Sequence, residues 1–175
     1  MAVVKQRIPL WIATPITVAV ATPLATRLGT WGLPVWISFI VWAEYFVLGA
    51  NMEALKMIGY GFLYGCLMTG FWLASSVALT SAMAFDIAFI ITNFIWIGLI
   101  VYSFKNPSIG KAVLPIFNGV SMTLAVYFTG ALPPVEVGAY SATFVAAFWA
   151  LIAGYFGGFL GWFNVAITFP YTAEE

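Results

Sequence analysis

Long apolar runs with almost no charge dominate this 175-residue chain and restrict what it can fold into. Hydrophobic residues make up 63% of the sequence and charged residues only 7%, whereas soluble domains carry roughly 25% charged residues. Because so little charge cannot cover a water-facing surface, lipid must be the main solvent. A membrane-crossing helix needs about 20 mostly apolar residues. The sequence therefore predicts an all-α, polytopic membrane helix bundle whose first partner is the lipid bilayer.

Six such runs follow one another with short connections, and we assign the whole chain to a single integral membrane domain. The predicted spans are about 8–26, 33–50, 57–79, 85–104, 112–131 and 140–169. The connections leave no room for a soluble catalytic domain. The first run, which contains the small residues ATPLAT, also resembles a signal peptide. We favour an uncleaved six-span chain, because it accounts for the positive charges that precede this run.

Lys and Arg residues are distributed unequally between the two ends of the predicted spans. With six spans, the side that holds both termini carries five of them, and the opposite side carries only Arg27. Cytoplasmic loops are enriched in Lys and Arg, so we predict that both termini are cytoplasmic. The five residues are Lys5, Arg7, Lys56, Lys105 and Lys111.

Two of the predicted spans resemble each other. LPVWISFIVWAEYFVLGA begins at Leu33 and LPIFNGVSMTLAVYFTGA begins at Leu114; both open with Leu-Pro and close with Gly-Ala. The two segments lie three spans apart and so cross the membrane in opposite directions. This pattern predicts an inverted 3+3 repeat. The alternative is that both dipeptides are simply common at the ends of membrane helices.

The composition excludes several kinds of chemistry. The chain has no histidine and one cysteine, Cys66, which excludes disulfide frameworks, zinc sites and His-ligated haem. Cys66 with Ser75 or Ser76 supplies no nucleophile–base pair. Net charge is zero, so nothing indicates nucleic-acid binding. We therefore expect no enzyme activity, no cofactor and no metal.

Glycines at helical spacing mark close helix contacts. Small residues allow backbones to approach in lipid, where no hydrophobic force drives helices together. Gly61 and Gly65 form such a pair in the third span, and the sixth span holds four more glycines. A gating hinge is the alternative interpretation. The same glycine faces favour self-association, so we expect a homo-oligomer. The four glycines are Gly154, Gly157, Gly158 and Gly161.

Three asparagines lie on three different predicted spans. Asn164 shares a helix face with Thr168, Asn118 lies in the fifth span and Asn93 in the fourth. An amide exposed to lipid would lack hydrogen-bond partners, so these faces must point into the bundle or into water. The three asparagines converge on one polar site for a solute in one interpretation. In the other, each amide satisfies a neighbouring backbone carbonyl and joins two helices.

Glu44 is the most unusual residue, because it places a carboxylate within the second span. A carboxylate in the middle of a membrane helix costs roughly 2.5–3.5 kcal/mol on insertion scales. We expect Glu44 to orient a solute or to couple transport to protons; alternatively, it is a neutral acid that joins two helices. Its candidate partners are the tyrosine hydroxyls and the asparagines Asn93, Asn118 and Asn164.

Three stretches resemble a known family: LGTWGLPVWISFIVWAEYFVLGANMEALK, VLPIFNG and IAGYFGGFLGWFNV. Together they are similar to the domain of unknown function 1097 family of small bacterial inner-membrane proteins. The likeness extends over roughly residues 31–169. It implies a multi-span protein of the bacterial inner (cytoplasmic) membrane, of poorly defined function, and it provides no catalytic residues.

The pattern of polar residues favours a small channel or facilitator for an uncharged polar solute, such as urea, a short amide or a small alcohol. An ion path would usually require rings of charge or a filter of carbonyls, and neither is visible in the sequence. The predicted solute-binding residues are Glu44, Asn93, Asn118, Asn164 and Thr168. The alternative is a structural or accessory subunit that packs in a larger membrane protein complex.

Overall fold

The computed structural model describes residues 2–174, with side chains described from Lys5 to Thr172. This part of the chain forms seven helices, so the predicted helical bundle is confirmed. Two short strands, which the sequence did not predict, pair antiparallel and join the two ends of the chain: β1 (Ala2–Gln6) and β2 (Pro170–Glu174). The helices are α1 (Leu10–Gly29), α2 (Trp36–Val47), α3 (Met52–Leu79), α4 (Phe85–Ser103), α5 (Pro107–Gly110), α6 (Val113–Thr129) and α7 (Ala139–Ala166).

Three of the helices, α3, α4 and α7, are long and apolar enough to cross a membrane. Helices α3 and α7 each contain 28 residues and α4 contains 19. Helices α2 and α6 are apolar but shorter, with 12 and 17 residues. At a rise of about 1.5 Å per residue, α2 is only about 18 Å long. The two short helices are therefore the elements that depend most on their neighbours.

The turn between α2 and α3 differs from the prediction, which ended the second span at residue 50 and began the third at residue 57. Helix α2 ends earlier, because Gly49 and Ala50 adopt positive φ angles of 97° and 52°. Helix α3 begins earlier, because the Asn51 side chain accepts a hydrogen bond from the Ala54 amide at 2.9 Å. An asparagine at this position is a favoured helix cap. Glu53 and Lys56, which we expected in a loop, therefore lie in the first turns of α3.

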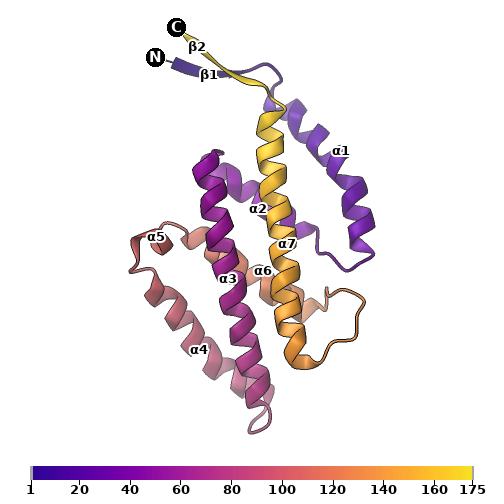
Figure 1. Cartoon of the computed structure of the whole chain (residues 1–175), viewed down its shortest axis with the longest axis vertical. Coiled ribbons are helices and arrows are strands. Elements are labelled where there is room, and N and C mark those ends of the chain that lie inside the picture. Colours follow the sequence, from indigo (N-terminus) through magenta and orange to yellow (C-terminus); the bar gives the residue numbers. More distant parts are fainter. Residues whose placement is uncertain (1, 175) are drawn as a thin grey trace.

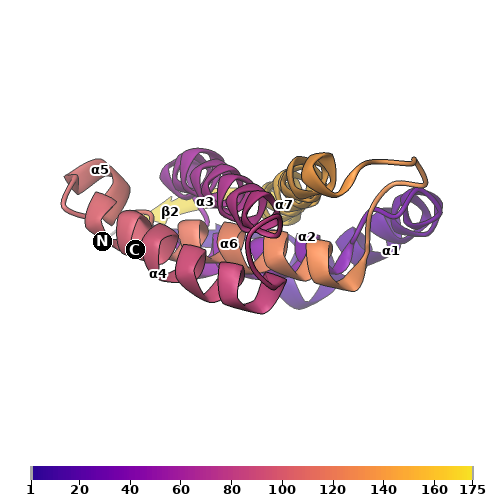
Figure 2. The ribbon, with the colours of Figure 1, turned by 90° about the horizontal axis from the view of Figure 1, so that it is seen from below.

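The helices form two layers. Viewed along the long axis, α3 and α7 lie together in one layer, and α4, α6, α2 and α1 follow one another in the second (Figure 2). Successive long helices alternate in direction along the molecule (Figure 1). Helix α6 packs on α3 and helix α2 packs on α7, while α4 and α1 pack on the outer sides of α3 and α7. The two short helices thus lie in the middle of their layer.

Glycines set the distances between the layers, as their spacing predicted. A Cβ atom on Gly65 of α3 would overlap the carbonyl oxygen of Ile116 in α6. A Cβ atom on Gly157 of α7 would likewise overlap the carbonyl oxygen of Ser38 in α2. Helices α3 and α7 approach each other where Gly154 lies against the ring of Phe62. Each short helix is therefore in backbone contact with one long helix.

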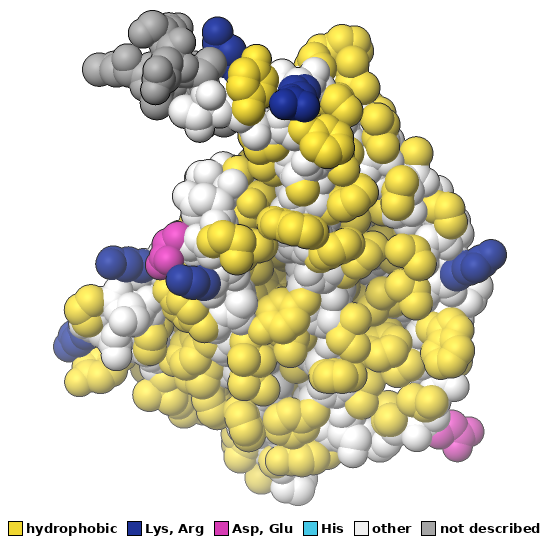
Figure 3. All heavy atoms as spheres, turned by 45° about the horizontal axis from the view of Figure 1, so that its top comes forward, with side chains coloured by type: hydrophobic (Ala, Val, Ile, Leu, Met, Phe, Trp, Pro, Cys, Tyr) yellow, Lys and Arg dark blue, Asp and Glu magenta, His cyan; other side chains and the backbone are white. Residues whose placement is uncertain are grey.

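Large apolar side chains cover much of the outer surface. Phe94 on α4 is 84% exposed and Trp11 on α1 is 76% exposed. The face drawn in Figure 3 is mostly hydrophobic, with Lys, Arg, Asp and Glu side chains towards its edges. Soluble monomers rarely expose contiguous apolar patches of more than a few hundred Å². This surface is compatible with a lipid environment.

Candidate functional site

Glu44 lies in the last turn of α2, where its carbonyl oxygen accepts the hydrogen bond from Leu48 that ends the helix. The prediction placed it in the middle of a span; the difference arises because α2 ends at Val47. The side chain is only 3% exposed. Among the described residues, it is the only Asp, Glu, Lys or Arg that is buried. Glu44 therefore remains the unusual residue of the chain.

The Glu44 side chain contacts Asn118 of α6. The Asn118 amide nitrogen Nδ2 donates a hydrogen bond to Glu44 Oε2 at 2.8 Å. The second carboxyl oxygen, Oε1, is buried and has no hydrogen-bond partner among the described residues. The one ion pair in this part of the chain joins Glu53 to Lys56 at the surface. The buried carboxyl group is therefore held by an amide, and one of its oxygens is available to a further donor.

The two short helices are held in place by the two long ones, which fixes the distance between Glu44 and Asn118. In α2, the Ser38 hydroxyl donates to the carbonyl oxygen of Ala153 in α7 at 2.8 Å. In α6, Gly119 packs so closely on α3 that a Cβ atom there would lie 2.5 Å from the carbonyl oxygen of Phe62. The long helices thus bring the carboxyl group and the amide together from two different parts of the chain.

Asn93 does not contact this pair. It lies on the outer side of α4, in a shallow groove of about 550 Å³ lined also by Phe94 and Gly98. Its side chain is half-buried and makes no hydrogen bond with any residue in the described range. Asn93 therefore does not join the other asparagines at one polar site, as one interpretation of the sequence predicted.

Asn164 and Thr168 lie near the end of α7, with neighbours of their own. The Thr14 hydroxyl of α1 donates to Asn164 Oδ1 at 3.2 Å. The Thr168 hydroxyl donates to the Val165 carbonyl oxygen at 2.7 Å, and its own carbonyl accepts hydrogen bonds from the Arg7 and Ile8 amides. Of the five predicted solute-binding residues, the structure joins only Glu44 and Asn118 by a hydrogen bond.

Comparison with known proteins identifies the family. The model of a family described as "Protein of unknown function (DUF1097)" matches residues 11–168 of the chain. The chain belongs to the DUF1097 family. The predicted resemblance is confirmed over nearly the whole sequence, and the family description assigns no site residue. No curated protein and no solved structure matches the chain.

This chain also uses hydroxyl groups for helix contacts that the sequence analysis did not predict. Ser76 of α3 and Thr92 of α4 are both buried, and their hydroxyl oxygens lie 2.6 Å apart. Beside them, the Trp96 indole nitrogen of α4 donates to the Ser75 hydroxyl at 2.9 Å. These contacts between helices are hard to predict from sequence, because serine and threonine hydroxyls in membrane helices usually bond a backbone carbonyl one turn earlier in their own helix. These contacts attach α4 to α3.

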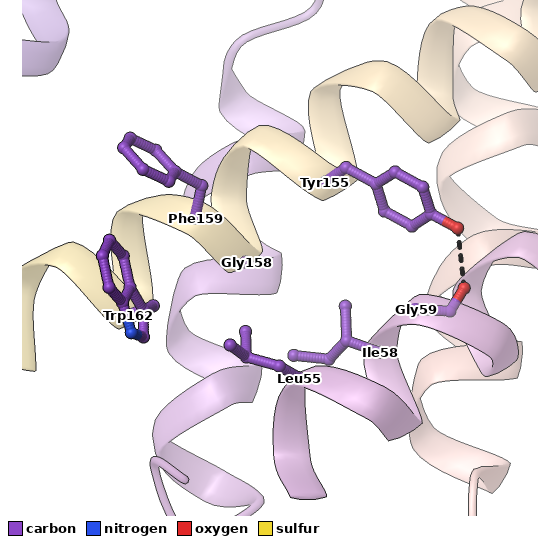
Figure 4. Close-up of a pocket in the computed structure, with 7 residues that line it drawn as sticks. All are labelled: Leu55, Ile58, Gly59, Tyr155, Gly158, Phe159 and Trp162. Carbon is purple, nitrogen blue, oxygen red and sulfur yellow. Dashed lines mark hydrogen bonds between the residues drawn. The ribbon is translucent and has the colours of Figure 1, made fainter. Parts of the chain in front are cut away.

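A groove between α3 and α7 offers little to a polar solute. It measures about 450 Å³ and is lined by Leu55, Ile58, Phe159 and Trp162, which surround an apolar space (Figure 4). The Tyr155 hydroxyl at its edge donates to the Gly59 carbonyl oxygen at 2.7 Å. None of the buried polar atoms without a partner in the described range belongs to a residue that lines this groove.

The Glu44–Asn118 pair in this DUF1097 protein offers groups that can form further hydrogen bonds. Glu44 Oε1 can accept a hydrogen bond. The Asn118 side chain keeps a second N–H donor and its carbonyl oxygen for others. Within residues 2–174, no three His, Cys, Asp or Glu side chains come close enough together to hold a metal ion. The Glu44–Asn118 pair is the candidate site in the following sections.

Proposed function

We propose that this protein is a six-span channel or facilitator for an uncharged polar solute, such as urea or a short amide, and that the solute passes the Glu44–Asn118 pair. The single observation that carries the proposal is this pair itself: a buried carboxyl group, bonded to an amide, with one oxygen lacking a partner. Ionisable groups inside membrane bundles are costly and usually belong to solute, ion or proton pathways.

The position of the pair supports the proposal. Glu44 and Asn118 belong to α2 and α6, the two short apolar helices, which occupy the middle of their layer. In transporters with inverted repeats, short segments at corresponding positions of the two halves meet at the substrate site. A solute path along the α2–α6 contact follows from this arrangement.

An inverted repeat of α1–α2–α3 and α4–α6–α7 is part of the proposal, and further features support it. IATPIT of α1 (12–17) and IAFIIT of α4 (87–92) share four of six residues. In each motif the alanine is fully buried and the threonine hydroxyl donates to that alanine's carbonyl oxygen. Helices α3 and α7 have the same length. The packing of α2 on α7 also mirrors the packing of α6 on α3.

The chemistry of the pair favours a neutral solute with hydrogen-bond donors. Glu44 Oε1 needs a donor, which the N–H groups of urea or an amide supply better than an apolar solute can. An anion would approach a carboxyl group with no cationic side chain beside it, because Glu44 is the only buried charged residue of the described range. A small alcohol also supplies a donor, through its O–H group, and is expected to pass as well.

The predicted orientation fits the alternating helices. Lys56 lies in the first turns of α3, and Lys105 and Lys111 lie between α4 and α6. If the helices α1, α2, α3, α4, α6 and α7 alternate across a bilayer, these residues share one side with the chain ends, and Arg27 at the end of α1 lies on the other. Both termini are then cytoplasmic, in the inner membrane of a bacterium.

A flux assay in proteoliposomes tests the proposed function. Purified protein is reconstituted, and the uptake of urea, acetamide and glycerol is followed by vesicle swelling. The proposal expects uptake of urea and acetamide above that of empty vesicles, and a loss of this excess for Glu44→Ala and Asn118→Ala. Asn93→Ala, an asparagine of α4 that lies away from the pair, serves as the matched control and retains uptake. Equal uptake by protein-containing and empty vesicles would refute the proposal.

A structural or accessory subunit is the second candidate, and a specific observation favours it. The outer face of α4 exposes Phe94, Ile90 and other large apolar side chains, together with the unbonded Asn93 amide. An amide on a lipid-facing surface gains a hydrogen bond if another membrane helix covers it. Absence of flux, together with co-purification of one other polypeptide that Asn93→Leu releases, would favour this function. Self-association stays a prediction, although the glycines on which it was based, such as Gly65 and Gly157, pack against helices of the same chain.

A further inference from the structure

A second groove lies between α1, α2 and α7, at the end of the molecule that carries the two chain termini. It measures about 350 Å³, and most of its wall is apolar, including Leu10 of α1 and Phe39 and Phe46 of α2. It lies on the side of α2 that faces α1, whereas Glu44 contacts α6. This groove is therefore separate from the proposed solute path.

Two buried hydrogen-bond donors in the wall of this groove have no partner. Asn164 is fully buried and Trp42 is 6% exposed, and both line the groove. Among the described residues, neither Asn164 Nδ2 nor Trp42 Nε1 has an acceptor. The Thr14 hydroxyl donates to Asn164 Oδ1, which leaves the amide nitrogen as the free end of the side chain. Two residues that line the apolar groove thus carry buried, unused N–H donors.

Unpaired donors of this kind are costly in a low-dielectric interior. A ligand that relieves the cost must bring an acceptor oxygen to the donors and an apolar body to the rest of the groove. Free amides and small alcohols lack such a body. An acyl chain attached through an ester has both parts: the chain fits the leucine and phenylalanine wall, and the ester carbonyl is an acceptor.

A positive charge lies beyond the donors, toward the chain termini. The Arg7 backbone amide donates to the carbonyl oxygen of Thr168 at 3.0 Å. Thr168 follows Asn164 by four residues and lies just beyond the end of α7 at Ala166. The exposed Arg7 guanidinium lies over the ring of Tyr171, 5.9 Å from its centroid. An arginine at this position suits a phosphate group, which in a phospholipid follows the ester carbonyl outward toward water.

We propose that the groove between α1, α2 and α7 is a binding site for a membrane phospholipid. The acyl chain lies against Leu10, Phe39 and Phe46. Its ester carbonyl accepts hydrogen bonds from Asn164 Nδ2 and Trp42 Nε1, and its phosphate group pairs with Arg7. The groove between α3 and α7 has no buried donor without a partner among the described residues, since its Trp162 indole is exposed (Figure 4), so we expect lipid selectivity at the first groove only.

Native mass spectrometry of the full chain tests the proposal with two lipids that share a phosphoglycerol headgroup. One has ester-linked chains and the other has ether-linked chains, which lack the carbonyl oxygen. Wild-type protein should retain the ester lipid about 30-fold better than the ether lipid, as expected for the loss of two hydrogen bonds that each contribute about fivefold. Trp42→Phe keeps the aromatic ring but removes the donor, and Asn164→Leu removes the amide. Each variant should reduce the preference for the ester about fivefold, and the double variant should abolish it.

Two further variants complete the design. Arg7→Gln should weaken both lipids equally, because it removes the contact with the phosphate and leaves the donors in place. Asn93→Leu, at the groove on α4, is the matched control and should keep the wild-type preference. Inorganic phosphate should not compete, because it lacks an acyl chain. Equal retention of ester and ether lipids by wild-type protein overturns the proposal, as does an undiminished, wild-type ester preference in folded Trp42→Phe protein.

Discussion

A carboxyl group that is buried in an apolar bundle and bonded to one amide is consistent with two different roles. It can join two helices, or it can meet a solute that enters between them. The Asn118 amide satisfies Glu44 Oε2, but Oε1 has no partner among the described residues. A residue that only joined helices would gain from having both oxygens bonded, because unpaired buried acceptors are destabilising. The unpaired oxygen therefore favours a role in solute recognition.

The hydrogen bond between Glu44 and Asn118 should be measurable as a coupling energy. We expect Glu44→Ala and Asn118→Ala to show a coupling of about 0.6 kcal/mol, and at most about 1.7 kcal/mol, the range found for bonds between membrane helices. The free energy of unfolding of the two single variants and the double variant, measured by denaturant titration in detergent, gives this value. Additive effects of the two substitutions would show that the bond does not form.

Glycine 157 of α7 should tolerate no side chain, because a Cβ atom there would overlap the carbonyl oxygen of Ser38. We expect Gly157→Ala to destabilise the bundle by about 1–3 kcal/mol, as overpacking commonly does. Gly98→Ala is the control, since nothing lies within 4 Å of the added atom and alanine favours a helix. Thermal melting in detergent compares them. A melting temperature for Gly157→Ala equal to that of Gly98→Ala would contradict the close contact between α2 and α7.

At the level of whole elements, the sequence predicted the helices well and their ends less well. Each long apolar run became a helix, because hydrophobic length is a strong signal. The turn between α2 and α3 was misplaced, since residues 48–56 remain mostly apolar and the capping by Asn51 depends on one local hydrogen bond. The strands β1 and β2 were missed, because their pairing joins opposite ends of the chain and neither segment alone has a distinctive pattern.

The candidate site was predicted in part for a similar reason. Glu44 was identified because a carboxylate in an apolar run is conspicuous, and Asn118 was among its candidate partners. The spacing of polar residues shows which side chains share a helix face, but not which faces of different helices meet. Asn93 and Asn164 therefore entered the predicted site although α4 and α1 give them other surroundings.

Helices α1 and α4 should respond in the same way to equivalent substitutions if they occupy equivalent places in two halves. Ala13 packs α1 and Ala88 packs α4, and both are fully buried. We expect Ala13→Leu and Ala88→Leu each to lower stability by about 1–3 kcal/mol. Val20→Leu, at an exposed position of α1, is the control and should have little effect. If thermal melting shows that only one alanine is sensitive, the two helices are not equivalent.

The proposed repeat divides the molecule into two halves, with one feature that they do not share. Each half supplies one peripheral helix, one short helix and one 28-residue helix. In the alignment of the two Leu-Pro segments, the position of Glu44 corresponds to Ala125. The carboxyl group is thus present in one half only. This asymmetry suits a solute path in which one half supplies the carboxyl group and the other supplies the Asn118 amide.

The orientation of the molecule can be tested with reporters fused to its ends. Five Lys and Arg residues are expected on the side of the termini and only Arg27 on the other, so the positive charges favour cytoplasmic termini. We expect a C-terminal fluorescent reporter that matures only in the cytoplasm to be active, and a phosphatase that folds only in the periplasm to be inactive. The reverse pattern would contradict a six-span chain with cytoplasmic ends.

Whether water and solute reach the Glu44–Asn118 pair is the central question, and thiol labelling answers it most directly. Cys66 is first replaced by alanine, and a single cysteine is then introduced by Asn118→Cys or, as the control, by Asn93→Cys. A water-soluble reagent modifies only a thiolate, so a cysteine at a dry helix contact stays unmodified. We predict labelling at position 118 in proteoliposomes, slowed by urea or acetamide, and none at position 93. A folded Asn118→Cys protein that is labelled only after denaturation would contradict the solute path.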